Sequence, residues 1–362
     1  MSPAAKPPRP GLLGIGVGVV AAGAAVGSMV ERRMLGRPLR DAEAHALGYG
    51  TVHSPPQIVT ADDGVELYVE VDEPRPGAAY GHLTVVFCHG YALNLDSWHH
   101  QRLALSGAAR CVYWDQRGHG RSGRGEPGPV DIDRTGADLA TVLAAAVPAG
   151  PVVLVGHSMG GMTVLALAAA HPELFGSRVV AAGLLSTSAG RLAEVTLGVP
   201  ALAARFLHRA APGVMSVLGR APRLVELGRR TGNDLEFALT RMYSFGSDVP
   251  AAVVDFVMQM NAGTPIEVVA DFFGAFDSHD KLVALPVLGR VPTLVMVGDS
   301  DLLTPAEHSE EMAAVVPTAE LVVLPDCGHM LMLEYPGEVN ARLRGLLDRA
   351  VEAVVAGGGD CA

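Results

Sequence analysis

The sequence predicts an α/β domain in which helices flank a mostly parallel central sheet. Apolar runs of strand length, such as residues 151–155 and 291–298, are continuous rather than alternating, which is typical of strands buried on both faces. A segment rich in Ala and Leu, at 162–170, follows the first run and indicates a helix. The chain has 362 residues and is 49% hydrophobic, which is enough for one large core.

The strands can be placed in chain order from the apolar runs and the polar loops that follow them. In the architecture that carries a serine turn of the kind described below, the run before residue 89 corresponds to the third strand of the sheet and the last two runs to the seventh and eighth. Expected strands therefore lie near 83–88, 112–114, 151–155, 179–186, 291–298 and 319–324.

Ser158 lies in the most informative motif of the chain. The sequence G-H-S-M-G-G at 156–161 follows a predicted strand and precedes a predicted helix. A serine in this setting occupies a sharp turn that exposes its Oγ, and small residues such as Gly156 and Gly160 are needed on both sides. An ordinary glycine-rich loop with a surface serine is the alternative. The flanking strand and helix favour a nucleophile elbow, with Ser158 as the nucleophile.

A serine hydroxyl is a poor nucleophile, so a base and a group that orients the base are expected later in the chain. His329 follows the last predicted strand and is the expected base. Asp301 lies in the loop beyond the preceding strand, from which its carboxylate can reach the histidine. Asp299 and Asp326 are the rival acids. Asp301 is preferred because Asp299 is expected on the last turn of the strand itself.

Two backbone N–H groups are expected to hold the oxyanion of a tetrahedral intermediate, each worth about 3 kcal/mol at the transition state. One is the amide of Met159, directly after the nucleophile. The other is the amide of Tyr91, in the loop after the third strand. His89 and Gly90 precede it in this loop and are expected to support its conformation rather than to take part in the chemistry.

Five motifs in this order resemble those of the α/β-hydrolase superfamily, over residues 57–355. The form of the motif at 156–161 is similar to that of monoacylglycerol lipases and carboxylesterases. Ser158 separates the chain from the haloalkane dehalogenase and epoxide hydrolase branches, which carry aspartate at that position. Perhydrolase-like and carbon–carbon-bond hydrolase branches share the serine and stay open. The motifs are H-G-Y at 89–91, D-Q-R-G-H-G-R-S at 115–122, G-H-S-M-G-G at 156–161, G-D-S-D at 298–301 and G-H at 328–329.

The resemblance implies the α/β-hydrolase fold and a serine hydrolase that cleaves carboxylic esters through a Ser-His-Asp triad and an acyl-enzyme. The apolar N-terminal segment and the cap, both described below, favour lipophilic acyl esters as substrates. No metal or organic cofactor is implied. The alternatives are carbon–carbon-bond hydrolysis, perhydrolysis or acyl transfer on the same serine, and a non-catalytic ligand-binding protein on the same fold. The net charge of −11 argues against nucleic acid as a partner. The sequence carries no signal for an oligomeric state.

The N-terminal region contains an uncharged apolar segment. Residues 11–30 are 20 positions without a charge, which is the length needed to span a bilayer. A membrane anchor is the first interpretation, and a secretory signal or a soluble Gly- and Ala-rich lead-in are the alternatives. The expected location is membrane-associated, with a cytoplasmic or exported protein as alternatives.

A long insertion separates the strand near 179–186 from the strand at 291–298, and the resemblance implies a helical cap over the active site. Residues 191–230 hold seven arginines against two glutamates, interspersed with apolar groups. Such a surface can lie on anionic lipid, or it can pack its apolar face on the core with the arginines in solvent. The stretches 242–245 and 272–276 are candidates for pocket lining, although core packing is the more ordinary role.

The predicted organisation of the chain combines these segments. It comprises a disordered N-terminus (1–10), the apolar segment (11–30), a linker (31–56), the first part of the hydrolase core (57–190), the cap (191–285), the second part of the core (286–355) and a flexible tail (356–362).

Overall fold

A computed structural model describes residues 48–147, 149–198 and 233–356. The apolar segment at 11–30 and most of the arginine-rich part of the insertion lie outside these residues, as do most of the linker and the C-terminal tail. None of the helices in the three described ranges combines the length and the hydropathy needed to cross a bilayer.

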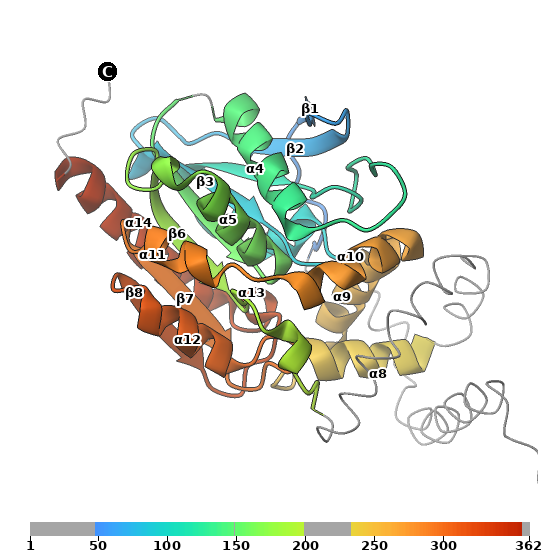
Figure 1. Ribbon diagram of the computed structural model, residues 1–362. Coiled ribbons are helices and arrows are strands. Elements are labelled where there is room, and N and C mark those ends of the chain that lie inside the picture. The colour runs from blue at the N-terminus through green and yellow to red at the C-terminus, as the bar shows by residue number, and fades with distance from the viewer. Residues whose placement is uncertain (1–47, 148, 199–232, 357–362) are drawn as a thin grey trace, which may run out of the picture.

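The centre of the fold is an eight-stranded sheet in the order β1-β2-β4-β3-β5-β6-β7-β8. β2 pairs antiparallel with β1 and β4, and all the pairings from β4 to β8 are parallel. The prediction of a mostly parallel sheet flanked by helices is therefore confirmed (Figure 1). The strands are β1 Pro56–Thr60, β2 Glu66–Asp72, β3 Tyr80–Cys88, β4 Ala109–Trp114, β5 Val152–His157, β6 Val179–Leu185, β7 Thr293–Gly298 and β8 Ala319–Leu324.

The burial of each strand explains the pattern of its sequence. Every residue of β5, β6 and β7 is buried, which accounts for their unbroken apolar runs. β1 and β8 form the two edges of the sheet, and most of their residues are exposed or half-buried. The sequence signal was therefore strongest for the central strands that carry the site.

Helices cover both faces of the sheet and create two apolar cores. One core joins the strands to α3, α9, α13 and α14, and the other joins them to α4, α5, α11 and α12. The helices are α3 His99–Leu105, α4 Ile132–Ala146, α5 Met159–Ala170, α8 Asn233–Ser244, α9 Ala251–Gly263, α10 Ile266–Ser278, α11 Leu285–Leu288, α12 Ala306–Val315, α13 Leu331–Glu334 and α14 Pro336–Ala356, with short 3-10 turns at Leu95–Trp98, Pro172–Leu174, Leu192–Glu194 and Leu282–Ala284.

The helices α8, α9 and α10 belong to the insertion between β6 and β7 and lie together beside the sheet (Figure 1). α10 packs on the start of α5, where Phe272 shares a small apolar core with Met159 and Met162. The two ends of the insertion meet, since the Lys281 N–H donates to the Ala189 carbonyl at 2.7 Å. The insertion thus leaves the core and returns to it at one place.

Candidate active site

Ser158 occupies the turn between β5 and α5. β5 ends at His157, α5 begins at Met159, and Ser158 has φ +52° and ψ −120°. Positive φ is unfavourable for a residue with a side chain, so the surrounding structure must hold it. The Ser158 N–H donates to the Leu185 carbonyl at the end of β6, at 2.9 Å, which fixes the turn to the neighbouring strand.

The glycines around Ser158 are required by close backbone contacts. A Cβ on Gly156 would lie 2.4 Å from the Gly160 carbonyl oxygen, and a Cβ on Gly160 would lie 2.0 Å from the Cys88 carbonyl oxygen. A Cβ on Gly161 would lie 2.6 Å from the side chain of Thr187. Backbone atoms cannot move aside as a flexible side chain can, so the first two positions admit only glycine.

His329 and Asp301 meet at the carboxyl ends of β8 and β7. His329 Nδ1 lies 2.8 Å from Asp301 Oδ2, and both side chains are largely buried. Asp301 Oδ1 also accepts from the N–H groups of Leu303 and Thr304, each at 2.9 Å. Burial by itself raises the pKa of Asp301, but attraction to the His329 ring and these hydrogen bonds outweigh it and hold the pKa below its usual value. The carboxylate is therefore ionised and can orient the imidazole.

Thr304 is a contact of this pair that the sequence analysis missed. Its Oγ1 donates to Asp301 Oδ2 at 2.9 Å and lies 3.3 Å from His329 Nδ1. A threonine three residues after an aspartate is common in loops, so no sequence signal separates it from an ordinary turn residue.

The rival acids lie elsewhere. Asp299 and Asp326 are both exposed, and neither is hydrogen-bonded to His329 in the described part of the chain. Asp299 accepts from the Ser300 hydroxyl at 2.9 Å, whereas Asp326 sits in a turn with φ +52°. Of the three candidate carboxylates, the structure brings Asp301 to the histidine.

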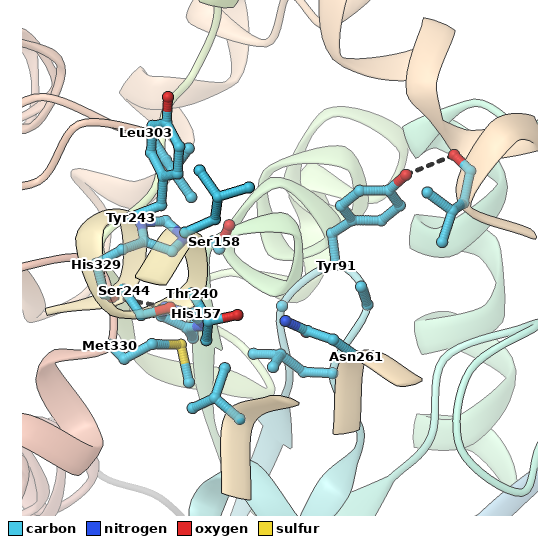
Figure 2. A pocket seen from close by; sticks show the side chains of 16 residues that line it. Tyr91, His157, Ser158, Thr240, Tyr243, Ser244, Asn261, Leu303, His329 and Met330 are labelled. Carbon is cyan, nitrogen blue, oxygen red and sulfur yellow. Dashed lines mark hydrogen bonds between the residues drawn. The ribbon is translucent and has the colours of Figure 1, made fainter. Parts of the chain in front are cut away.

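The amides of Tyr91 and Met159 have no acceptor among the described residues. The Tyr91 hydroxyl donates to the Val269 carbonyl at 2.5 Å, and its ring packs edge-on against Phe276 at a centroid distance of 4.9 Å. Figure 2 shows this side chain pointing toward α10 and away from Ser158. The side chain of Tyr91 is therefore held by α10, and Tyr91 is among the residues that line the cavity beside Ser158.

His89 and Gly90 shape the loop before Tyr91. His89 Nδ1 donates to the Gly90 carbonyl at 2.7 Å, and His89 Nε2 accepts from the Gln116 N–H at 2.9 Å. Burial lowers the pKa of His89 to about 3, so the ring is neutral and its tautomer is set by these two bonds. A Cβ on Gly90 would lie 2.8 Å from His157 Nδ1, which explains the small residue at that position.

His157, inside the elbow motif, is a second contact that the sequence analysis did not single out. Its Nε2 donates to the backbone carbonyl of His329 at 2.9 Å, and the two rings lie 4.8 Å apart. Burial lowers the pKa of His157 to about 3, and the nearby His329 ring contributes in the same direction. The neutral ring supports the loop that carries His329.

Ser158 and His329 line one cavity of about 380 Å³ (Figure 2). Among the described residues, Ser158 Oγ and His329 are not hydrogen-bonded to each other. Hydrogen bonds between a nucleophile and its base are often long before substrate binds. Of the two candidate lining stretches, 242–245 contributes two residues to the cavity wall. The stretch 272–276 contributes none, and the core packing favoured for it is found, since Phe272 is buried against α5. The lining residues are Gly90, Tyr91, Ala92, Leu93, His157, Ser158, Leu239, Thr240, Tyr243, Ser244, Val257, Asn261, Val269, Leu303, His329 and Met330.

The cavity is weakly polar. None of its described lining residues is an acid, a lysine or an arginine. Within the described ranges no group of three or more His, Cys, Asp or Glu side chains is arranged to hold a metal ion. The arrangement can therefore accept a neutral, largely apolar molecule beside a serine and a histidine–aspartate pair.

The buried histidines predict a strong loss of stability in mild acid. Burial lowers the pKa of His89, His119 and His157 to about 3, 4 and 3. In the unfolded chain these rings take up protons near pH 6.5, so below that pH the unfolded state binds more protons than the folded state. The free energy of unfolding should fall as the pH falls from 6.5 toward 4, by up to about 1.4 kcal/mol per pH unit for each ring. Urea unfolding at pH 7.5, 6.5 and 5.5 measures this slope.

Two variants separate this effect from general acid sensitivity. His119→Asn retains a donor for the Arg117 carbonyl, which His119 Nδ1 contacts at 2.9 Å. It should reduce the dependence of the unfolding free energy on pH by the contribution of one ring, up to about 1.4 kcal/mol per pH unit. His82→Asn, at an exposed position, should leave the slope as in the wild type. Equal slopes in both variants would contradict the assignment to buried rings.

The fold and this site define the class of protein. The model of the alpha/beta hydrolase fold family matches residues 84–336, and the chain belongs to this family. The resemblance predicted from the five motifs is thereby confirmed. Enzymes with hydrolytic activity are prominent among its relatives, and the chain is a hydrolase of the alpha/beta hydrolase type.

Three relatives show the range of similarity. A non-heme haloperoxidase of Rhodococcus erythropolis is 30% identical over 298 residues, which cover 80% of this chain and 98% of the relative. A monoacylglycerol lipase of Mycolicibacterium smegmatis is 33% identical over 134 residues, which cover 36% of this chain and 46% of the relative. The structure of a thermophilic esterase from Thermogutta terrifontis, with malate bound, matches with a TM-score of 0.63 and 26% identity and covers 82% of this chain and 99% of that one.

Proposed function

We propose that this protein hydrolyses carboxylic esters through a triad of Ser158, His329 and Asp301. The observation that carries the proposal is the 2.8 Å contact between His329 Nδ1 and a buried Asp301, with His329 and Ser158 lining the same cavity. The similarity to an esterase and a monoacylglycerol lipase supports the choice of ester substrates.

The reaction follows from the roles of these groups. His329 accepts the Ser158 proton while Oγ attacks the ester carbonyl, and the amides of Tyr91 and Met159 hold the developing oxyanion. The protonated imidazole then gives its proton to the leaving alcohol, and an acyl-enzyme remains. Water, activated by the same histidine, attacks the acyl-enzyme and releases the carboxylic acid. Asp301 keeps the useful tautomer of His329 and stabilises its charged form throughout.

The cavity argues for lipophilic, uncharged acyl esters of limited size. Its volume of about 380 Å³ lies at the lower end of the range for small-molecule sites, roughly 300–1,000 Å³. Leu239, Val257 and Val269 give it apolar walls. We assign α8, α9 and α10 to a cap, since α8 and α9 supply several of the lining residues. Esters with short or medium acyl chains should therefore be the best substrates.

A chain-length series on the full-length protein tests the proposal. Wild type and Ser158→Ala are assayed side by side with p-nitrophenyl esters from acetate to dodecanoate, and a serine-directed phosphonate is used to label each protein. The expected result is turnover that peaks at short or medium chains in the wild type alone, with the phosphonate on the peptide that contains Ser158. Turnover that persists in Ser158→Ala, or a label on another peptide, would contradict the proposal.

Perhydrolysis is the second candidate, favoured by the similarity to a haloperoxidase over 98% of that relative's length. In that reaction hydrogen peroxide replaces water as the acceptor of the acyl group, and a peracid is released. The same acyl-enzyme would serve both reactions. Assays with peroxide and a short carboxylic ester, read by peracid formation, distinguish the two candidates.

A further inference from the structure

Glu334, the last residue of α13, binds two separate loops through one carboxylate. Its Oε2 accepts from the Gly328 N–H at 2.7 Å, in the loop that carries His329. Its Oε1 accepts from the Ser247 N–H at 2.5 Å and from the Ser247 hydroxyl at 2.6 Å, in the loop that follows α8. The Gly246 N–H lies 3.3 Å from Oε2 and completes the set. A single side chain therefore joins segments that are more than 80 residues apart in the sequence.

The two loops are also in direct backbone contact. A Cβ on Gly328 would lie 2.7 Å from the Gly246 nitrogen, and a Cβ on Gly246 would lie 2.8 Å from the Cys327 carbonyl carbon. The Met330 N–H donates to the Ser244 carbonyl at 2.8 Å. The backbone on both sides of His329 is thus held against the end of α8.

α8 is at the same time a wall of the cavity. Leu239, Thr240, Tyr243 and Ser244 all line it, and Ser244 is the residue whose carbonyl holds Met330. Because Glu334 and the close glycine contacts connect the end of α8 to the loop of His329, we expect a shift of one to move the other. The helix that lines the cavity is therefore in direct contact with the loop that carries His329.

We propose that Glu334 is a positioning residue, which fixes the loop of His329 to the end of α8 so that the placement of the base depends on the helix that lines the cavity. This inference rests on the proposed role of His329 in ester hydrolysis. It predicts that a substrate in contact with α8 stabilises the productive position of His329. Short esters that do not reach α8 should therefore be more sensitive to loss of Glu334 than longer ones.

Glu334→Gln tests this role with little change in the shape of the side chain. One carboxylate oxygen is replaced by an amide NH2 group, which cannot accept hydrogen bonds from the donors that face it. We expect kcat to fall about 10- to 100-fold, as for a displaced reacting group, with a smaller change in KM and a larger loss for p-nitrophenyl acetate than for the octanoate. Glu334→Asp should recover part of the lost rate. The matched control is Glu338→Gln, where the carboxylate binds Arg342 at 2.7 Å on the surface of α14, and its kcat should stay within about twofold.

A second measurement needs no turnover and separates this inference from the proposed function. Hydrogen exchange of the amides of Gly246, Ser247 and Gly328 should accelerate together in Glu334→Gln and not in Glu338→Gln. The rate of phosphonate labelling of Ser158, which requires the histidine, should fall in the same variant. If the wild type hydrolyses no ester but labelling still depends on Glu334, the proposed substrate is wrong and the positioning role stands.

Other outcomes overturn the positioning role. Faster exchange with unchanged kcat and labelling would make Glu334 a purely structural contact. Unchanged exchange would show that the two loops are not joined through this carboxylate. If Glu334→Gln does not fold, Ser247→Ala removes only the hydroxyl donor, and it must then show a several-fold loss of kcat with the same preference for longer esters.

Discussion

Asp301→Asn is expected to lower kcat about 10⁴-fold with little change in KM. An amide in place of the carboxylate cannot stabilise the charged imidazole, and its N–H group favours the wrong tautomer of His329. The ionised state of Asp301, set by His329 and the Thr304 donors, is what the substitution removes. Steady-state kinetics with p-nitrophenyl butyrate measure the loss.

Asp299→Asn is the matched control, because it makes the same chemical change two residues away on an exposed side chain. Its kcat should remain close to that of the wild type. A larger loss in Asp299→Asn than in Asp301→Asn would reverse the assignment of the acid.

Gly160→Ala should destabilise the folded protein by more than about 3 kcal/mol or prevent folding. The added Cβ would lie 2.0 Å from the Cys88 carbonyl oxygen, so the backbone at the end of β3 or the start of α5 would have to move to admit it. Urea unfolding followed by circular dichroism gives the change in the free energy of unfolding.

Gly274→Ala makes the same substitution where there is room. Gly274 is exposed within α10, and no described atom outside the adjoining residues and the local helix backbone lies within 4 Å of the position of the added Cβ. Alanine should stabilise this helix by about 0.5–1 kcal/mol. Similar stability of the two variants would show that the elbow tolerates a side chain and that the contact at Gly160 is not limiting.

The fold was predictable because its central strands are buried on both faces. Such strands read as continuous apolar runs, and the glycines of the elbow are set by close backbone contacts within the turn and with β3, which any sequence with this turn must satisfy. The proximity of Asp301 and His329 followed from the same reasoning, since adjacent parallel strands bring their carboxyl ends to one edge of the sheet.

Other features of the site were beyond prediction because they depend on contacts between distant segments. The carboxylate of Glu334 meets Ser247 across 87 residues, and nothing in either local sequence marks the pairing. The aromatic stretches at 242–245 and 272–276 have similar compositions, yet Tyr243 lines the cavity whereas Phe272 packs against Met159 and Met162 beneath the elbow. Which face of a helix meets substrate is decided by how the helices pack, and that packing is set by the whole chain.

The meeting of the insertion's two ends has a consequence for how such an enzyme diversifies. Because Ala189 and Lys281 are joined at 2.7 Å, the distance that the insertion must bridge stays small whatever its length. Replacing the insertion or changing its length therefore costs little loop-closure entropy and need not move β6 or β7. Recombination at this junction can therefore replace the insertion while β6 and β7 stay in place. Any replacement must also reproduce the contact with Glu334.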